Sequence, residues 1–139
     1  MDSLFPKQMM EKGSGNSLTL EVIAQKLSYY HEQLHLFHFQ TKSYAEHKAL
    51  CEIYGYVGDF KDGIIEKIMG YMGRRLNAYT IPPLKNYSDG CTCSCVKELN
   101  EFAYQLEEFG KTNRMCDVEN LAQELSGQAA RTLYLLTLN

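Results

Sequence analysis

The chain has 139 residues, of which 45% are hydrophobic, so it is long and apolar enough for one domain with a core that needs no disulfide or metal. A formal net charge of -3 argues against a protein that coats nucleic acid, because that role needs clustered basic residues. No apolar run approaches the ~20 residues of a membrane span, and the first residues lack the basic-then-apolar order of a secretory signal, so we expect neither feature. The odd number of cysteines, five, favours reduced thiols and a cytoplasmic location.

Two long amphipathic helices are predicted in the first half of the chain. Apolar residues recur at steps of three and four between Ser17 and Thr41, and Ser17 is available as the N-cap. The same periodicity runs from about Ala45 to about Met72 and predicts a second helix. Residues 1–16 are predicted to form a flexible N-terminal arm.

A long connection is predicted after the second helix. The segment NAYTIPPLKNYSDGCTCSC contains Pro82-Pro83 and Asp89-Gly90, and these pairs interrupt any continuous helix. We therefore expect a crossover between the second and third helices.

Two further helices are predicted in the second half of the chain. Apolar periodicity resumes at Val96 and is expected to stop at Gly110, acting as a C-terminal cap residue. A last helix is expected to open at Asp117. The whole pattern predicts an all-α four-helix bundle with one long crossover, in a single domain that spans residues 17–139.

All four histidines lie within residues 31–50. His31, His35 and His38 are spaced to share one face of the first helix. His47 follows a short turn, and helices joined so tightly are antiparallel neighbours, so His38 and His47 should lie at the same end of the bundle. A single histidine is most simply a polar flank, but the clustering favours half of a transition-metal site.

Carboxylates for the other half of such a site are found further along the second helix. Asp62 and Glu66 share one face of it, but at ~1.5 Å per residue they lie about 20–30 Å beyond His47. Either the acids are solvated and unrelated, or a second copy packs antiparallel about a twofold axis. Gly55 and Gly58 lie midway; they mark either a kink or a close approach of another backbone.

Residues 38–70 resemble the first-to-second-helix region of the Dps (DNA-protection-during-starvation) mini-ferritins, in the ferritin-like superfamily. The family signature is a histidine before an aromatic residue, then a second histidine, then an Asp-x-x-x-Glu pair. The matching residues are His38-Phe39, His47, Asp62 and Glu66. The similarity covers residues 17–139, and the short turn is similar to a phage-encoded branch.

The resemblance implies a ferritin-like fold with iron sites between subunits. His38 and His47 of one chain and Asp62 and Glu66 of another would be the metal ligands, with the two acids as the catalytic pair. The implied activity is ferroxidase, the oxidation of ferrous iron by peroxide or oxygen, with iron storage in a homo-oligomeric shell. The homo-oligomer would be a dimer at least, and at most a twelve-subunit cage. Cys51 is a departure, because many members carry an acidic ligand at its position.

The alternative is a non-catalytic ferritin-like phage protein that acts as a structural, host-interaction or ligand-binding oligomer. The basic tail with which some family members bind DNA is missing, because the first 16 residues contain only Lys7 and Lys12. We therefore expect no nucleic-acid or membrane partner. If the chain is phage-encoded, its expected location is the host cytoplasm or the virion.

The cysteine-rich segment CTCSC offers a separate hypothesis. In an extended segment Cys91, Cys93 and Cys95 would lie on one side, and with Cys116 they would form a thiolate zinc site. The spacing lacks the usual two-residue gap, and no histidine is nearby in the sequence. Reduced thiols are therefore favoured over zinc, and disulfide exchange ranks third.

Overall fold

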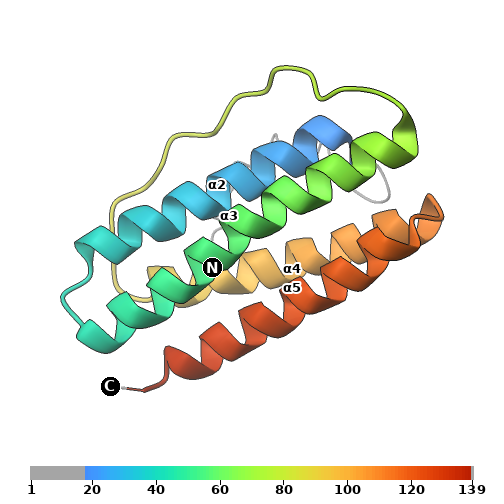
Figure 1. The fold of residues 1–139 in the computed structure, drawn as a ribbon. Coiled ribbons are helices and arrows are strands. Elements are labelled where there is room, and N and C mark those ends of the chain that lie inside the picture. Colours follow the sequence, from blue (N-terminus) through green and yellow to red (C-terminus); the bar gives the residue numbers. More distant parts are fainter. Residues whose placement is uncertain (1–17, 139) are drawn as a thin grey trace.

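The computed structural model describes residues 18–138, which form four helices and no strand. The helices are α2 (Leu20–Gln40), α3 (Tyr44–Met72), α4 (Cys91–Thr112) and α5 (Cys116–Leu135). Figure 1 shows two helical hairpins, α2–α3 and α4–α5, packed against each other. The predicted all-α four-helix bundle is therefore confirmed, whereas the predicted arm, residues 1–16, lies outside the described residues.

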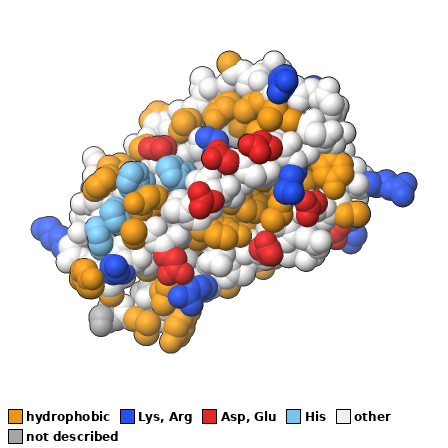
Figure 2. Space-filling view, viewed as in Figure 1, with side chains coloured by type: hydrophobic (Ala, Val, Ile, Leu, Met, Phe, Trp, Pro, Cys, Tyr) orange, Lys and Arg blue, Asp and Glu red, His pale blue; other side chains and the backbone are white. Residues whose placement is uncertain are grey.

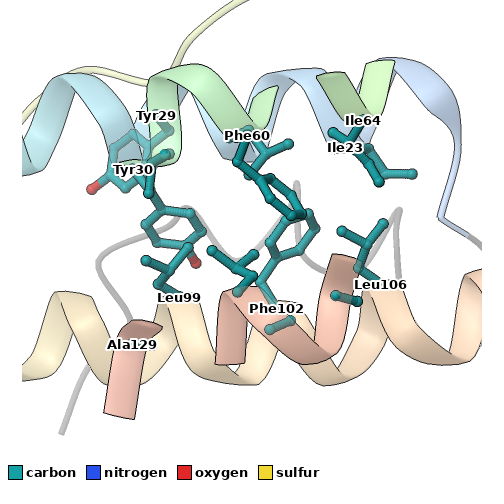
Figure 3. Packing of buried hydrophobic residues seen from close by; sticks show 14 of the residues in the cluster. Ile23, Tyr29, Tyr30, Phe60, Ile64, Leu99, Phe102, Leu106 and Ala129 are labelled. Atoms are coloured by element: carbon teal, nitrogen blue, oxygen red, sulfur yellow. The ribbon is translucent and has the colours of Figure 1, made fainter. Parts of the chain in front are cut away.

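A continuous hydrophobic core fills the space between the two hairpins. Figure 3 shows Tyr30 of α2 above Leu99 and Phe102 of α4, and the Tyr30 and Phe102 ring centroids are 6.2 Å apart. Every residue of the two predicted apolar seams is buried, and each such side chain contributes about 1.5–3 kcal/mol through its removal from water. The seam residues are Leu20, Ile23, Leu27, Tyr30, Leu34 and Phe37 of α2 and Leu50, Ile53, Val57, Phe60, Ile64 and Ile68 of α3.

Hydroxyl side chains cap both helices of the first hairpin. The Thr19 hydroxyl accepts a hydrogen bond from the Val22 N–H at 3.1 Å, so Thr19 is the N-cap of α2. The prediction that Ser17 takes this role is wrong, and Ser17 itself lies outside the described residues. Ser43 caps α3 in the same way, by accepting from the Glu46 N–H at 3.2 Å.

The boundaries of α4 differ from the prediction at both ends. Gly90 has a φ of 77°, and α4 begins at the next residue, so the cysteine-rich segment is helix rather than crossover. Gly110 does not end the helix. A Cβ atom at Gly110 would lie 2.7 Å from the backbone nitrogen of Glu119, so this glycine allows α5 to approach closely. The Asn113 backbone then closes α4.

The connection between α3 and α4, residues 73–90, runs along the outer side of α2 from one end of the bundle to the other (Figure 1). Polar side chains of α2 hold it there. The contacts are Glu21 with Arg74 and Asn77, Gln25 with Thr80, Ser28 with Tyr79, Gln33 with Lys85, and Gln40 with Asn86 and Tyr87. One side of α2 is thus covered by the crossover, and another faces the core.

None of the helices within residues 18–138 is long and apolar enough to cross a membrane.

Candidate metal-binding face

The four histidines form a row of neighbouring rings on the outer face of the α2–α3 hairpin. Ring centroids are 6.0 Å apart for His31 and His35 and 5.8 Å apart for His35 and His38. His38 and His47 are closest, with centroids 3.9 Å apart and ring planes 23° from parallel. Figure 2 shows the imidazoles gathered over one end of this face. The predictions that three histidines share a face and that His38 and His47 lie at the same end of the bundle are confirmed, and the two rings are in contact.

His47 lies in the first turn of α3, and its tautomer is set by the backbone. Its Nδ1 is 3.0 Å from the carbonyl oxygen of His38. Because a carbonyl only accepts, Nδ1 carries the proton and donates, which leaves the lone pair of a neutral ring on Nε2. Histidines that bind metals are usually oriented by such a second hydrogen bond. His47 is therefore prepared for ligation through Nε2.

His38 contains an unpartnered buried nitrogen. His38 is only 9% exposed. Among the side chains of residues 18–138, its Nδ1 is the single buried nitrogen or oxygen without a hydrogen-bond partner. Burial lowers the pKa of His38, and the neighbouring His47 and His35 lower it further. This shift favours the neutral ring, which is the state that binds metals.

The stacked arrangement of His38 and His47 is not itself a chelate. An imidazole directs its lone pair within the ring plane, so two nearly parallel rings do not point at one ion. Across residues 18–138 no group of three or more His, Cys, Asp or Glu side chains is placed to hold a metal. Ligation at this pair requires one ring to turn and further ligands to arrive from elsewhere.

Aromatic side chains surround the imidazoles. The Tyr54 ring stacks on that of His35, with the ring centroids 4.3 Å apart. The Phe39 ring centroid lies 4.6 Å from that of His35, and Phe39 is 69% exposed. Tyr44, next to His47, is 76% exposed. Sequence reasoning missed the stacking of Tyr54 on His35; the position of Tyr54 seven residues after His47, two helical turns on, was the available signal.

The acid pair lies at a different place on the same helix. Asp62 and Glu66 are both exposed, and with Lys61, Ile65 and Leu76 they line a shallow hollow of about 240 Å³. In Figure 2 acidic side chains follow the histidines along the same face. One chain therefore does not bring the carboxylates to the imidazoles.

The two glycines between these groups differ in their surroundings. At Gly58 a Cβ atom would lie 3.1 Å from the imidazole of His31, so a side chain of the same molecule covers this glycine. At Gly55 nothing lies within 4 Å of that position. The sequence suggested either a kink or the close approach of another backbone at these glycines; within this chain the space at Gly58 is taken by the His31 side chain, and the surface above Gly55 is open.

Cys51 and Glu52 follow His47 by one turn and point differently. Cys51 is exposed, and after the larger effect of burial its proximity helps to raise the pKa of the Tyr54 hydroxyl. Glu52 turns away toward α5, where Arg131 donates to it at 2.9 Å. The Glu52 carboxylate is therefore engaged with α5.

The remaining cysteines do not form the thiolate cluster considered from the sequence. Cys91 and Cys95 are buried in the first turns of α4, where burial raises the pKa of both thiols, and Cys93 points differently from them. Cys116 is exposed at the start of α5, at the opposite end of α4. The assumption of an extended segment is wrong, and the four sulfurs are not assembled.

Glu46 anchors the start of α3, next to His47 in the chain. Its carboxylate accepts hydrogen bonds from Thr41 in the turn, from Tyr87 of the crossover at 2.6 Å, and from Thr92 of α4 at 2.8 Å. Burial alone favours the protonated acid, but the three hydroxyl donors outweigh it and lower the pKa of Glu46. The residue next to His47 is therefore anchored as a carboxylate to three other segments.

The fold and this face together define a four-helix bundle with an uncovered imidazole cluster on one hairpin and an acid pair further along it. Residues 38–136 match the model of a family described as a family of unknown function, DUF5856, and the chain belongs to that family. The matched region includes both His38 and Glu66.

A relative in Enterobacteria phage T4 is described as an uncharacterized 14.6 kDa protein in the mobD-ri intergenic region. It is 31% identical over 104 residues, which cover 75% of this chain and 77% of that protein. The comparison with solved structures found no match.

Proposed function

We propose that the protein is a Dps-like mini-ferritin of the ferritin-like superfamily, which binds ferrous iron as its substrate between two copies, oxidises it, and stores it in an oligomeric shell. The observation that carries the proposal is the state of the histidine pair. His47 holds its Nε2 lone pair available, and His38 has a buried nitrogen without a partner. Both lie on an uncovered face that continues to an acid pair.

The second copy is required by the layout of α3. Nitrogen donors lie at the start of this helix and oxygen donors several turns later, so one ion cannot reach both sets in one chain. In a twofold dimer each contact occurs twice, and antiparallel packing of α3 on its symmetry mate places the start of one helix beside the later turns of the other. Two equivalent sites would then form.

The proposed chemistry uses the two kinds of donor differently. Neutral His38 and His47 would bind ferrous iron, and the harder carboxylate oxygens of Asp62 and Glu66 would favour the ferric product. One peroxide takes one electron from each of two ferrous ions and, with two protons, leaves as two waters. Entry of iron requires the stacked rings to separate, and turning the His38 ring achieves this by breaking only ring contacts, because the His47 hydrogen bond goes to the backbone carbonyl of His38.

Ferrous iron added anaerobically, followed by peroxide, tests this function. We expect ferric absorbance to develop with the wild-type protein and to be lost in Asp62→Asn. The matched control is Asp59→Asn, which makes the same change at another exposed acid of α3 and should leave the reaction intact. Equal loss in both variants, or no iron binding by the wild type, would contradict the proposal.

A second candidate is a non-catalytic phage oligomer that binds a host protein or small ligand. The exposed aromatic rings of Phe39 and Tyr44 beside the histidines favour it, because large exposed apolar side chains mark interaction surfaces. An oligomer that does not bind ferrous iron would support this candidate. The phage relative is consistent with either role in an infected host's cytoplasm.

A further inference from the structure

We propose that Cys51 is a metal ligand of the same site, placed opposite Asp62 of the second copy. The inference rests on the proposed two-copy site and extends it to a sulfur donor. Its consequence is that the site binds divalent metals with affinity for thiolates, such as zinc and cobalt, in addition to ferrous iron.

One outward stripe of α3 carries all the residues concerned. At 3.6 residues per turn they fall within about 100° of the helix circumference, away from the buried seam. In chain order they are His47, Cys51, Gly55, Gly58, Asp62 and Glu66. Residues that can donate to a metal lie toward both ends of the stripe, and the two middle positions are glycines, which have no side chain.

The spacing along this stripe is symmetric. The midpoint between Gly55 and Gly58 is also the midpoint between Cys51 and Asp62, and between His47 and Glu66. A twofold axis through that point therefore sets Gly55 opposite Gly58 of the second copy and Cys51 opposite its Asp62. The same register sets His47 opposite Glu66 of the second copy. One packing arrangement therefore pairs each metal-donor residue of the stripe with one from the other copy.

The surface at the middle of the stripe fits this register. The His31 imidazole projects over Gly58, at 3.1 Å from the position of a Cβ atom there, while Gly55 has open space above it. In the twofold arrangement the His31 ring of one copy meets the free surface of Gly55 in the other. A side chain at position 55 would occupy that space, which gives a physical reason for glycine in an exposed helix position.

The surroundings of Cys51 connect it to the histidines. Cys51 lies one turn before Tyr54 on α3, and the Tyr54 ring centroid is 5.1 Å from that of His38. The buried Nδ1 of His38, which has no partner, is an independent sign that this cluster lacks a ligand. A sulfur one turn after His47 and on the same stripe adds a soft donor to the two imidazoles.

Cobalt(II) is the probe that separates sulfur ligation from ligation by nitrogen and oxygen alone. With the reduced protein and no oxygen, we expect a sulfur-to-cobalt charge-transfer band together with the weaker ligand-field bands. Cys51→Ser should lose the charge-transfer band and keep ligand-field absorption. Cys116→Ser is the matched control, because that thiol is also exposed but lies at the start of α5, and it should keep both. Circular dichroism checks that each variant is folded.

The outcomes distinguish this inference from the proposed function. Ligand-field bands without a charge-transfer band in the wild type would overturn the role of Cys51 while the two-copy site stands. A charge-transfer band that depends on Cys51 but is unchanged in Asp62→Asn would overturn the pairing with a second copy and keep the sulfur ligand. Absence of any cobalt binding would overturn both the sulfur ligand and the pairing with a second copy, and the iron assay tests the proposed function separately.

Discussion

Gln33 and Lys85 exchange two hydrogen bonds across the surface of α2. The side-chain amide of Gln33 donates to the Lys85 carbonyl at 2.8 Å, and its oxygen accepts from the Lys85 N–H at 2.8 Å. Gln33 is fully buried beneath the crossover. Its amide thus satisfies both backbone groups of one residue, as a neighbouring strand would, and fixes the register of the crossover on α2.

Substitution Gln33→Met should destabilise the fold, because it retains the volume but leaves both polar groups of Lys85 without this partner. We expect a loss of about 1–3 kcal/mol in the free energy of unfolding. Urea denaturation measures it. The control Gln123→Met removes an exposed side-chain contact with Glu107 and should change stability by less than about 0.5 kcal/mol. Equal effects of the two substitutions would contradict the role of Gln33.

Two glycines in the α4–α5 hairpin should respond to alanine in opposite directions. At Gly110 a Cβ atom meets the Glu119 backbone at 2.7 Å, so Gly110→Ala should cost about 1–3 kcal/mol. At Gly127, in α5, nothing lies within 4 Å, and Gly127→Ala should stabilise by about 0.5–1 kcal/mol through helix propensity. Thermal denaturation of both variants tests the pair, and the same sign for both would refute the close approach of α5 at Gly110.

Leucine at position 55 should block association without harming the fold. Gly55 and Gly70 are both exposed glycines of α3 with open space at the Cβ position, so leucine is tolerated by the single chain at either. We expect Gly55→Leu to shift the protein to monomers in light scattering or sedimentation, and Gly70→Leu to leave the oligomer unchanged. An oligomer that persists in Gly55→Leu would place the interface elsewhere.

Glu21 should contribute stability that disappears in acid. Hydrogen bonds from Arg74, then from the Asn77 N–H, lower the pKa of Glu21 from 4.5 to about 2, against the opposing effect of burial. The folded state therefore binds fewer protons than the unfolded state between these values, and the stabilisation present above pH 4.5 is lost as the pH falls toward 2.

The measurement is urea unfolding of wild type and Glu21→Gln at pH 7 and at steps down to pH 3. The variant should be less stable than wild type at pH 7, and the difference should shrink in acid. Glu108→Gln, at an exposed position of α4, serves as control and should stay within about 0.5 kcal/mol of wild type throughout. A difference in the free energy of unfolding between wild type and Glu21→Gln that grows in acid would contradict the prediction.

The helices were largely predictable because their apolar spacing corresponds directly to the buried seams. Their ends were less so. Ser17 and Thr19 carry equivalent hydroxyls, so the sequence alone did not select the cap that the backbone uses. Gly110 has the residue type of a helix end but serves close packing, and that distinction depends on where α5 lies.

The meeting of His38 and His47 was predictable from the short turn between their helices. The tautomer of His47 was not, because it depends on the position of the His38 carbonyl in space. Sequence spacing also showed that Asp62 cannot reach these histidines within one chain. The crossover contacts of α2 were missed, since glutamines at irregular spacing give no periodic signal.

The Glu46 carboxylate joins the turn, the crossover and α4 immediately before His47 in the chain. The backbone that carries this imidazole is thereby immobilised during folding, before any ion arrives. At the proposed site, capture of a metal by His47 would lose little conformational entropy beyond the rotation of one ring. The affinity of that site would in this sense be prepared by a residue that never touches the ion.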